Sequence, residues 1–187
     1  MKSLEDLAMH ILEILMNSIK AGASLITLKI RDSFNDDVIA FTIEDNGKGM
    51  DEEMVKKAAD PFTTSRTTRR IGMGLAFMKG LAETCGGEFN IQSTPGKGTI
   101  VSASVQKLNI DTPELGNIGE MMMESVQSNE AIDYVLDYST DYGQFVFDSR
   151  IIKEELAGVS LLEPEILIWI KEYINQGIEQ AKEDTQQ

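Results

Sequence analysis

The chain has 187 residues, 42% of them hydrophobic, which is enough for one ordinary domain with a real core or for one domain with a smaller appendage. No segment approaches the roughly 18 consecutive apolar residues that a membrane span requires, and the N-terminus lacks the apolar stretch of a signal peptide. The single cysteine, Cys85, excludes an internal disulfide. Together these observations predict a cytoplasmic protein without a membrane partner.

The net charge of −14 is unevenly distributed along the chain. Residues 1–106 hold 12 Lys and Arg against 14 Asp and Glu, whereas residues 107–187 hold 5 against 17. This step predicts a domain over residues 1–106 and an acidic C-terminal extension over residues 107–187. Because the extension would repel phosphates, nucleic acid is not expected as a partner.

In chain order, the first predicted elements are a helix and a hairpin. Apolar residues at helical spacing predict a helix over residues 3–21. Alternating apolar residues predict strands over 25–31 and 38–44, which the short polar loop between them joins as a hairpin. A short helix is predicted over 51–59.

The next elements follow a long polar segment without periodicity, DPFTTSRTTRRIGMG. An apolar-faced helix over residues 75–84 ends at a glycine pair, and two strands over 88–94 and 99–106 are joined by the turn sequence PGKG. The extension predicts a second hairpin between helices, with helices over 114–126, 151–156 and 164–182 and strands over 132–139 and 144–148. This order predicts an α+β fold, a two-layer α/β sandwich with a small, acidic, α-rich C-terminal extension.

The first helix carries a narrow polar stripe. Its members are spaced by four, three, four and three residues, which places them on one line of the helix: Asp6, His10, Glu13, Asn17 and Lys20. The alternative is a solvent-facing surface, although the stripe is narrow. The residue types also suit a catalytic site, because a carboxylate can activate a nucleophile, an asparagine can ligate Mg²⁺ and a lysine can meet a phosphate.

Two glycine-containing loops are further candidates. In DNGKGM, Asp45 follows a buried strand and could accept a hydrogen bond from an amine, while Gly47 and Gly49 would let the backbone approach a flat ligand. A plain turn before a helix capped by Asp51 is the alternative. The second loop places Gly72 and Gly74 before a helix, where free N–H groups can hold phosphate, although it matches neither the dinucleotide fingerprint nor the P-loop.

The order of these motifs resembles the GHKL superfamily of ATPases and kinases, which has the Bergerat fold and includes gyrase B, Hsp90, histidine kinases and MutL. The resemblance covers about residues 4–106. It rests on five segments: EILMNSIKAGAS is similar to the N box, DNGKGM to the G1 box, DPFTTS to the F box of histidine kinases, GMGL to the G2 box, and GKGT to the closing strand.

The resemblance implies roles for individual residues. Asp45 would bind the adenine amino group with a water near Thr99, Gly49 would lie beside the base, and Asn17 would ligate Mg²⁺. Gly72 and Gly74 would form the phosphate end of a lid over residues 60–74. The remaining cofactor-binding residues that the motifs imply are Gly47, Met50, Phe62 and Leu75.

The branch of the superfamily depends on a few residues. Lys20 and the F box resemble histidine kinases, whereas NSIKAGAS is closer to MutL and Glu13 suits a hydrolytic base. Glu13 and Lys20 are the predicted catalytic residues. The only histidine, His10, lies inside the N box and does not resemble a phosphoacceptor, so a kinase would act on a separate protein.

The sequence therefore favours an enzyme, a Mg-ATP-dependent phosphotransferase of the histidine kinase type that acts on a separate protein, or a weak ATPase. The alternatives are a serine kinase similar to anti-sigma factors and a hydrolysing clamp similar to MutL. The extension is interpreted as a partner-docking module, with its EMMMES run in a core or a helix contact. A homodimer is left open.

Overall fold

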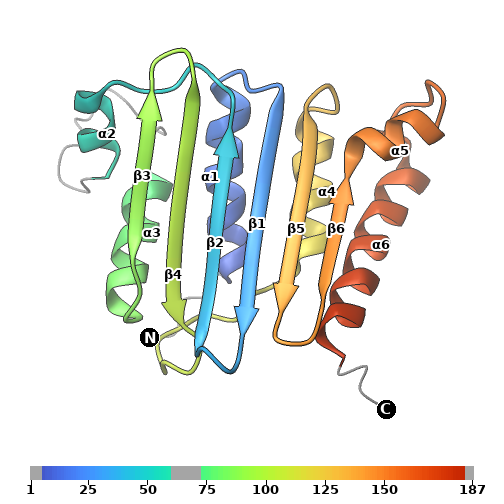
Figure 1. Ribbon diagram of the computed structural model, residues 1–187. Helices are drawn as coiled ribbons and strands as arrows, with labels where there is room; N and C mark the ends of the chain where they lie inside the picture. The colour runs from blue at the N-terminus through green and yellow to red at the C-terminus, as the bar shows by residue number, and fades with distance from the viewer. Residues whose placement is uncertain (1–5, 60–72, 184–187) are drawn as a thin grey trace.

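The computed structural model describes residues 6–59 and 73–183 (Figure 1). One six-stranded sheet has the strand order β3-β4-β2-β1-β5-β6. Its strands are β1 (Leu25–Ser33), β2 (Val38–Asp45), β3 (Phe89–Thr94), β4 (Gly98–Gln106), β5 (Asp133–Thr140) and β6 (Gln144–Asp148). The helices are α1 (Leu7–Lys20), α2 (Glu52–Ala58), α3 (Met73–Thr84), α4 (Ile118–Ser128), α5 (Ser149–Glu155) and α6 (Pro164–Lys182).

The helices α1, α3, α4 and α6 cover one face of the sheet, and the other face has no second layer in the described part of the chain (Figure 1). The predicted two-layer α+β sandwich is therefore confirmed. Both predicted hairpins are confirmed as well, since β1 pairs with β2 and β5 pairs with β6 in antiparallel register. No helix in residues 6–59 and 73–183 has the length and apolar character needed to cross a membrane.

The predicted C-terminal extension contributes to the same sheet. β5 pairs with β1 in parallel register, from Leu25 opposite Asp133 to Asp32 opposite Thr140. The chain reaches β5 from β4 through α4, which crosses the helix-covered face of the sheet. The extension thus places two of the six strands at one end of the sheet.

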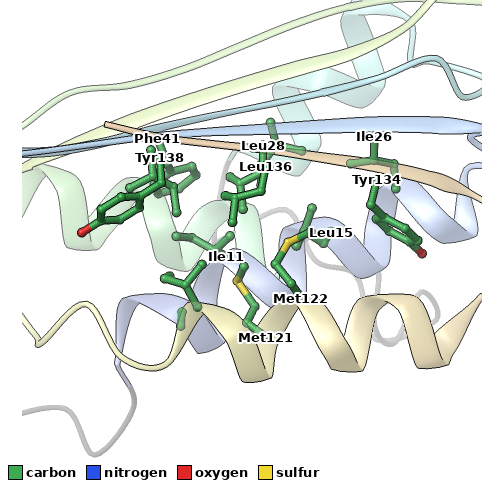
Figure 2. Close-up of a cluster of buried hydrophobic side chains, with 14 of the residues drawn as sticks. Ile11, Leu15, Ile26, Leu28, Phe41, Met121, Met122, Tyr134, Leu136 and Tyr138 are labelled. Carbon is green, nitrogen blue, oxygen red and sulfur yellow. The ribbon is translucent and has the colours of Figure 1, made fainter. Parts of the chain in front are cut away.

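One hydrophobic core joins the two parts of the chain (Figure 2). Ile11 and Leu15 of α1 face Met121 and Met122 of α4 beneath the sheet. The side chains of the sheet that close this cluster are Ile26, Leu28, Phe41, Tyr134, Leu136 and Tyr138. The EMMMES run therefore fills the core between a helix and the sheet, as its composition indicated.

Polar contacts also tie the extension to the first 106 residues. The N–H groups of Leu7 and Ala8 have no acceptor within α1, because they lie in its first turn. They donate at 2.9 Å to the carbonyls of residues 114 and 115. The buried Tyr138 hydroxyl donates to Asp32 at 2.8 Å, and Lys107 pairs with the same carboxylate. Burial raises the pKa of Tyr138, with the Asp32 charge adding to the effect. The division at residue 107 into separate units stays a prediction.

Candidate functional site

A pocket of about 120 Å³, partly open to solvent, lies between α1, the β2–α2 turn, α3 and the start of β4. It brings together seven of the residues that the sequence singled out: Asn17, Lys20, Asp45, Gly49, Met50, Leu75 and Thr99. Ile14, Met54 and Val101 add apolar walls that the motifs did not indicate.

Asp45 is the buried carboxylate of this pocket, with 7% of its surface exposed. It is the last residue of β2, and α1 packs beside it. Oδ2 accepts the hydroxyl of Ser18 at 2.7 Å, and Oδ1 accepts the N–H of Gly47 at 2.8 Å. A carboxylate has about four acceptor sites, so Asp45 can still accept from a donor in the pocket.

The sequence analysis assigned no role to Ser18. It is buried in α1 and fixes the orientation of the Asp45 carboxylate. A serine on the apolar side of an otherwise apolar helix was the available signal, because a buried hydroxyl needs a partner. Asn46 is a second residue to which the sequence analysis assigned no role. Its Oδ1 accepts the N–H groups of Ser24 and Leu25 and so holds the start of β1 against the β2–α2 turn.

The two glycines of the β2–α2 turn are required by contacts within the protein. Gly49 has φ +66°, and a Cβ there would lie 2.0 Å from the carbonyl oxygen of Thr94 at the end of β3. A Cβ on Gly47 would lie 2.9 Å from Ala21 Cβ at the end of α1. The sequence analysis predicted glycine here so that the backbone could approach a flat ligand. The structure adds a second reason, because these glycines let the turn pack closely against two neighbouring elements.

Replacing Gly49 with alanine is expected to lower the free energy of unfolding by about 1–2 kcal/mol for the left-handed backbone and about 1–3 kcal/mol more for the clash with Thr94. Gly96→Ala is the matched control, because Gly96 has φ +75° and open space around its Cβ position. Urea unfolding of both variants measures the difference. Equal losses for the two variants would show that the packing at Gly49 is not tight.

Thr99 lies directly opposite Asp45 in the β2–β4 ladder. Its hydroxyl is 2.9 Å from that of Ser93, which accepts the N–H of Met50 at 2.8 Å. The chain of contacts links the floor of the pocket to the turn that carries Gly49 and Met50. Thr99 is thus placed where a pocket ligand near Asp45 would meet a second hydroxyl.

The predicted catalytic residues lie at different places. Lys20 lines the rim of the pocket at the last turn of α1. Glu13 lies about two turns earlier in α1 and is exposed beside the start of α3, where a Cβ on Gly74 would be 2.9 Å from Glu13 Oε2. Two predicted residues, Phe62 and Gly72, fall outside the described residues, as does most of the lid over residues 60–74.

The polar stripe of α1 divides into different functions. Asp6 caps the helix by accepting the N–H of Met9 at 2.9 Å. His10 is buried, with 2% of its surface exposed, and stacks on Phe77 of α3 at 4.9 Å between ring centroids. Only Asn17 and Lys20 of the stripe line the pocket.

Two solved structures share this fold. One is the N-terminal domain of a DNA repair protein, with TM-score 0.53 and 19% identity over 75% of this chain and 51% of that chain. The other is the Aquifex aeolicus MutL ATPase domain complexed with ADP, with TM-score 0.51 and 15% identity over 73% of this chain and 61% of that chain. At these identities the likeness shows the fold alone.

The fold that these structures share is the two-layer α/β sandwich. Residues 3–109 match the histidine kinase-, DNA gyrase B-, and HSP90-like ATPases, and the chain belongs to this family.

Sequence relatives place the domain near histidine kinases. The chain is 35% identical over 101 residues to the non-motile and phage-resistance protein of Caulobacter vibrioides, covering 49% of this chain. It is 27% identical over 135 residues to the circadian input-output histidine kinase CikA of Synechocystis, covering 68% of this chain. The chain spans 12% and 18% of the length of these two relatives.

Proposed function

We propose that this chain binds Mg-ATP in the pocket at Asp45 and transfers the γ-phosphoryl group to a separate protein. The observation that carries the nucleotide site is the buried Asp45 carboxylate, which is oriented by two hydrogen bonds and has acceptor capacity to spare. An adenine ring offers a matching amino group beside a flat apolar surface. The apolar walls formed by Ile14, Leu75 and Val101 suit that surface.

The polar rim of the pocket suits a triphosphate. Asn17 and Lys20 lie one turn apart on α1 and both line the pocket. Asn17 would ligate Mg²⁺, which usually takes only one or two protein ligands beside phosphate oxygens and waters. When bound, the ion would neutralise charge on the phosphates, and the Lys20 ammonium would hold them from the helix end.

The phosphoacceptor is proposed to lie outside these residues. His10 is the only histidine, and it is buried beneath Phe77. It lies one turn before Glu13 on α1, whereas Asn17 lies one turn after Glu13. Glu13 of α1 is exposed beside the start of α3, so its carboxylate is accessible to an acceptor on a second protein. There it would accept the proton of the attacking group as the phosphoryl group is transferred.

Labelling tests the proposal. The purified chain is incubated with Mg²⁺, γ-³²P-labelled ATP and lysate of the host cell. A labelled second protein that is absent with Asp45→Asn is the expected result, and an acid-labile label would identify phosphohistidine. An acid-stable label would support a serine kinase instead. Phosphate release without any labelled protein would contradict phosphotransfer and support a hydrolysing clamp.

Glu13→Gln is expected to slow the transfer about 100-fold, because the variant cannot accept a proton. ATP affinity should change by less than about threefold, since Glu13 lies outside the pocket wall. Single-turnover transfer rates and a nucleotide titration measure the two effects separately. Glu83→Gln, at an exposed carboxylate near the end of α3, is the matched control. An unchanged rate with Glu13→Gln would leave Glu13 without a catalytic role.

A further inference from the structure

The strand β6 leaves the far end of the sheet open. Thr140 N–H donates to the Gly143 carbonyl at 2.8 Å, which makes residues 140 and 143 a hydrogen-bonded pair of the hairpin. Antiparallel pairs alternate, so Phe145 and Phe147 bond to β5, whereas the N–H and C=O groups of Gln144, Val146 and Asp148 point away from the sheet. β6 is the outermost strand (Figure 1), so no further strand of the described residues pairs with these groups.

An aromatic ladder accompanies this edge on the helix-covered side. Phe145 packs on Gly177, where a Cβ would lie 2.1 Å from the ring, and meets Tyr173 edge-on at 5.5 Å. Trp169 stacks on Tyr173 at 4.9 Å with a 10° angle between the rings. Trp169 and Tyr173 are 44% and 39% exposed, so a large part of both rings is accessible to solvent.

The ladder faces outward, away from the rest of the helix layer. Lys171 and Asn175 lie on the opposite side of α6, where they contact Glu120 and Gly119 of α4. At about 100° per residue, Trp169 and Tyr173 therefore lie on the side of α6 that continues past β6. An additional strand beside β6 would have alternate side chains directly on these two rings.

The charge around this edge indicates the partner. Residues 107–187 carry 17 acidic and 5 basic residues, and Glu165 and Glu172 flank the ladder on its solvent side. Within residues 6–59 and 73–183, neither of these two carboxylates has an ion-pair partner. A second copy of this chain would place like charges together, so self-pairing through β6 is disfavoured.

We propose that the β6 edge binds an extended, Lys- or Arg-rich segment of another protein as a seventh strand of the sheet. Its backbone pairs with Gln144, Val146 and Asp148, its alternate apolar side chains pack on Trp169 and Tyr173, and its basic residues face Glu165 and Glu172. This surface lies at the opposite end of the sheet from the Asp45 pocket, so it does not depend on the proposed function.

A random dodecapeptide library displayed on phage and selected on the full chain tests this proposal. The expected peptides carry a net positive charge and apolar residues at alternate positions. Binding of the best peptide, synthesised without tryptophan, is followed by the fluorescence of Trp169, the only tryptophan of the chain. Val146→Pro removes an outward N–H without removing a bond to β5, and it is expected to weaken binding at least about tenfold.

A second variant with two substitutions keeps the test decisive if the proline disturbs folding. Glu165→Lys combined with Glu172→Lys changes only exposed helix positions and should weaken binding by a similar factor, most strongly at low salt. The library yielding no binder, peptides of neutral or acidic composition, or binding that both sets of variants leave unchanged would overturn the proposal. A dimer in light scattering that Val146→Pro dissociates would also overturn it, because the occupant would then be a second copy.

Discussion

Replacing Asp45 with asparagine is expected to weaken ATP binding about 100-fold while the protein stays folded. The amide can keep its oxygen on Gly47 N–H and turn its NH₂ group to Ser18, whose hydroxyl can rotate to accept. The NH₂ group then replaces acceptor sites on the pocket side, so the adenine amino group meets a donor. The loss of a hydrogen bond to a charged group is worth about 1.5–3 kcal/mol, which corresponds to roughly 10- to 100-fold in affinity.

Isothermal titration calorimetry with ATP and Mg²⁺ measures this effect, and thermal unfolding without nucleotide confirms that the variant is folded. Glu44→Gln is the matched control, because residue 44 precedes Asp45 on the same strand and is exposed on the other face of the sheet. Its ATP affinity should equal that of the unmodified chain. An Asp45→Asn variant that binds ATP normally would remove the basis for the assigned site.

Removing residues 113–187 is expected to abolish cooperative folding of the remaining fragment. The deletion uncovers the edge of β1 along its whole pairing with β5 and takes away the α4 side chains that pack on Ile11 and Leu15. It also removes the carbonyl partners of the first N–H groups of α1. The deletion exposes apolar surface whose burial stabilises the fold. We expect the lost free energy to exceed the free energy of unfolding of a typical domain, which is about 5–15 kcal/mol.

Circular dichroism and thermal unfolding compare the fragment with the full chain. A milder version of the test is Leu136→Ala, at a position with no exposed surface, which should cost about 2–5 kcal/mol. Val146→Ala, at a 52% exposed position on the neighbouring strand, should cost far less and serves as its control. A fragment that unfolds cooperatively and binds ATP like the full chain would support the predicted division into a domain and a separable docking module.

Much of the lining of the pocket at Asp45 could be predicted because its residues are close to element ends that local patterns reveal. Alternation placed Asp45 just after a buried strand, and the glycine pair marked the turn that follows. Ser18 had no such pattern around it, so its bond to Asp45 emerged only when α1 packed beside β2. The contact that requires glycine at position 49 comes from Thr94, which is 45 residues away and invisible to local periodicity.

The sequence by itself determined the elements and the family, because hydrophobic periodicity and the order of short motifs are local properties of the chain. Only the tertiary structure decided that the acidic extension completes the sheet, with β5 parallel to β1 and α4 beside α1. The pattern of β5 is compatible with many partners, since alternation tells which face is buried but not against what. The choice is made by the shared burial of Leu28, Leu136 and their neighbours, over a separation of more than 100 residues.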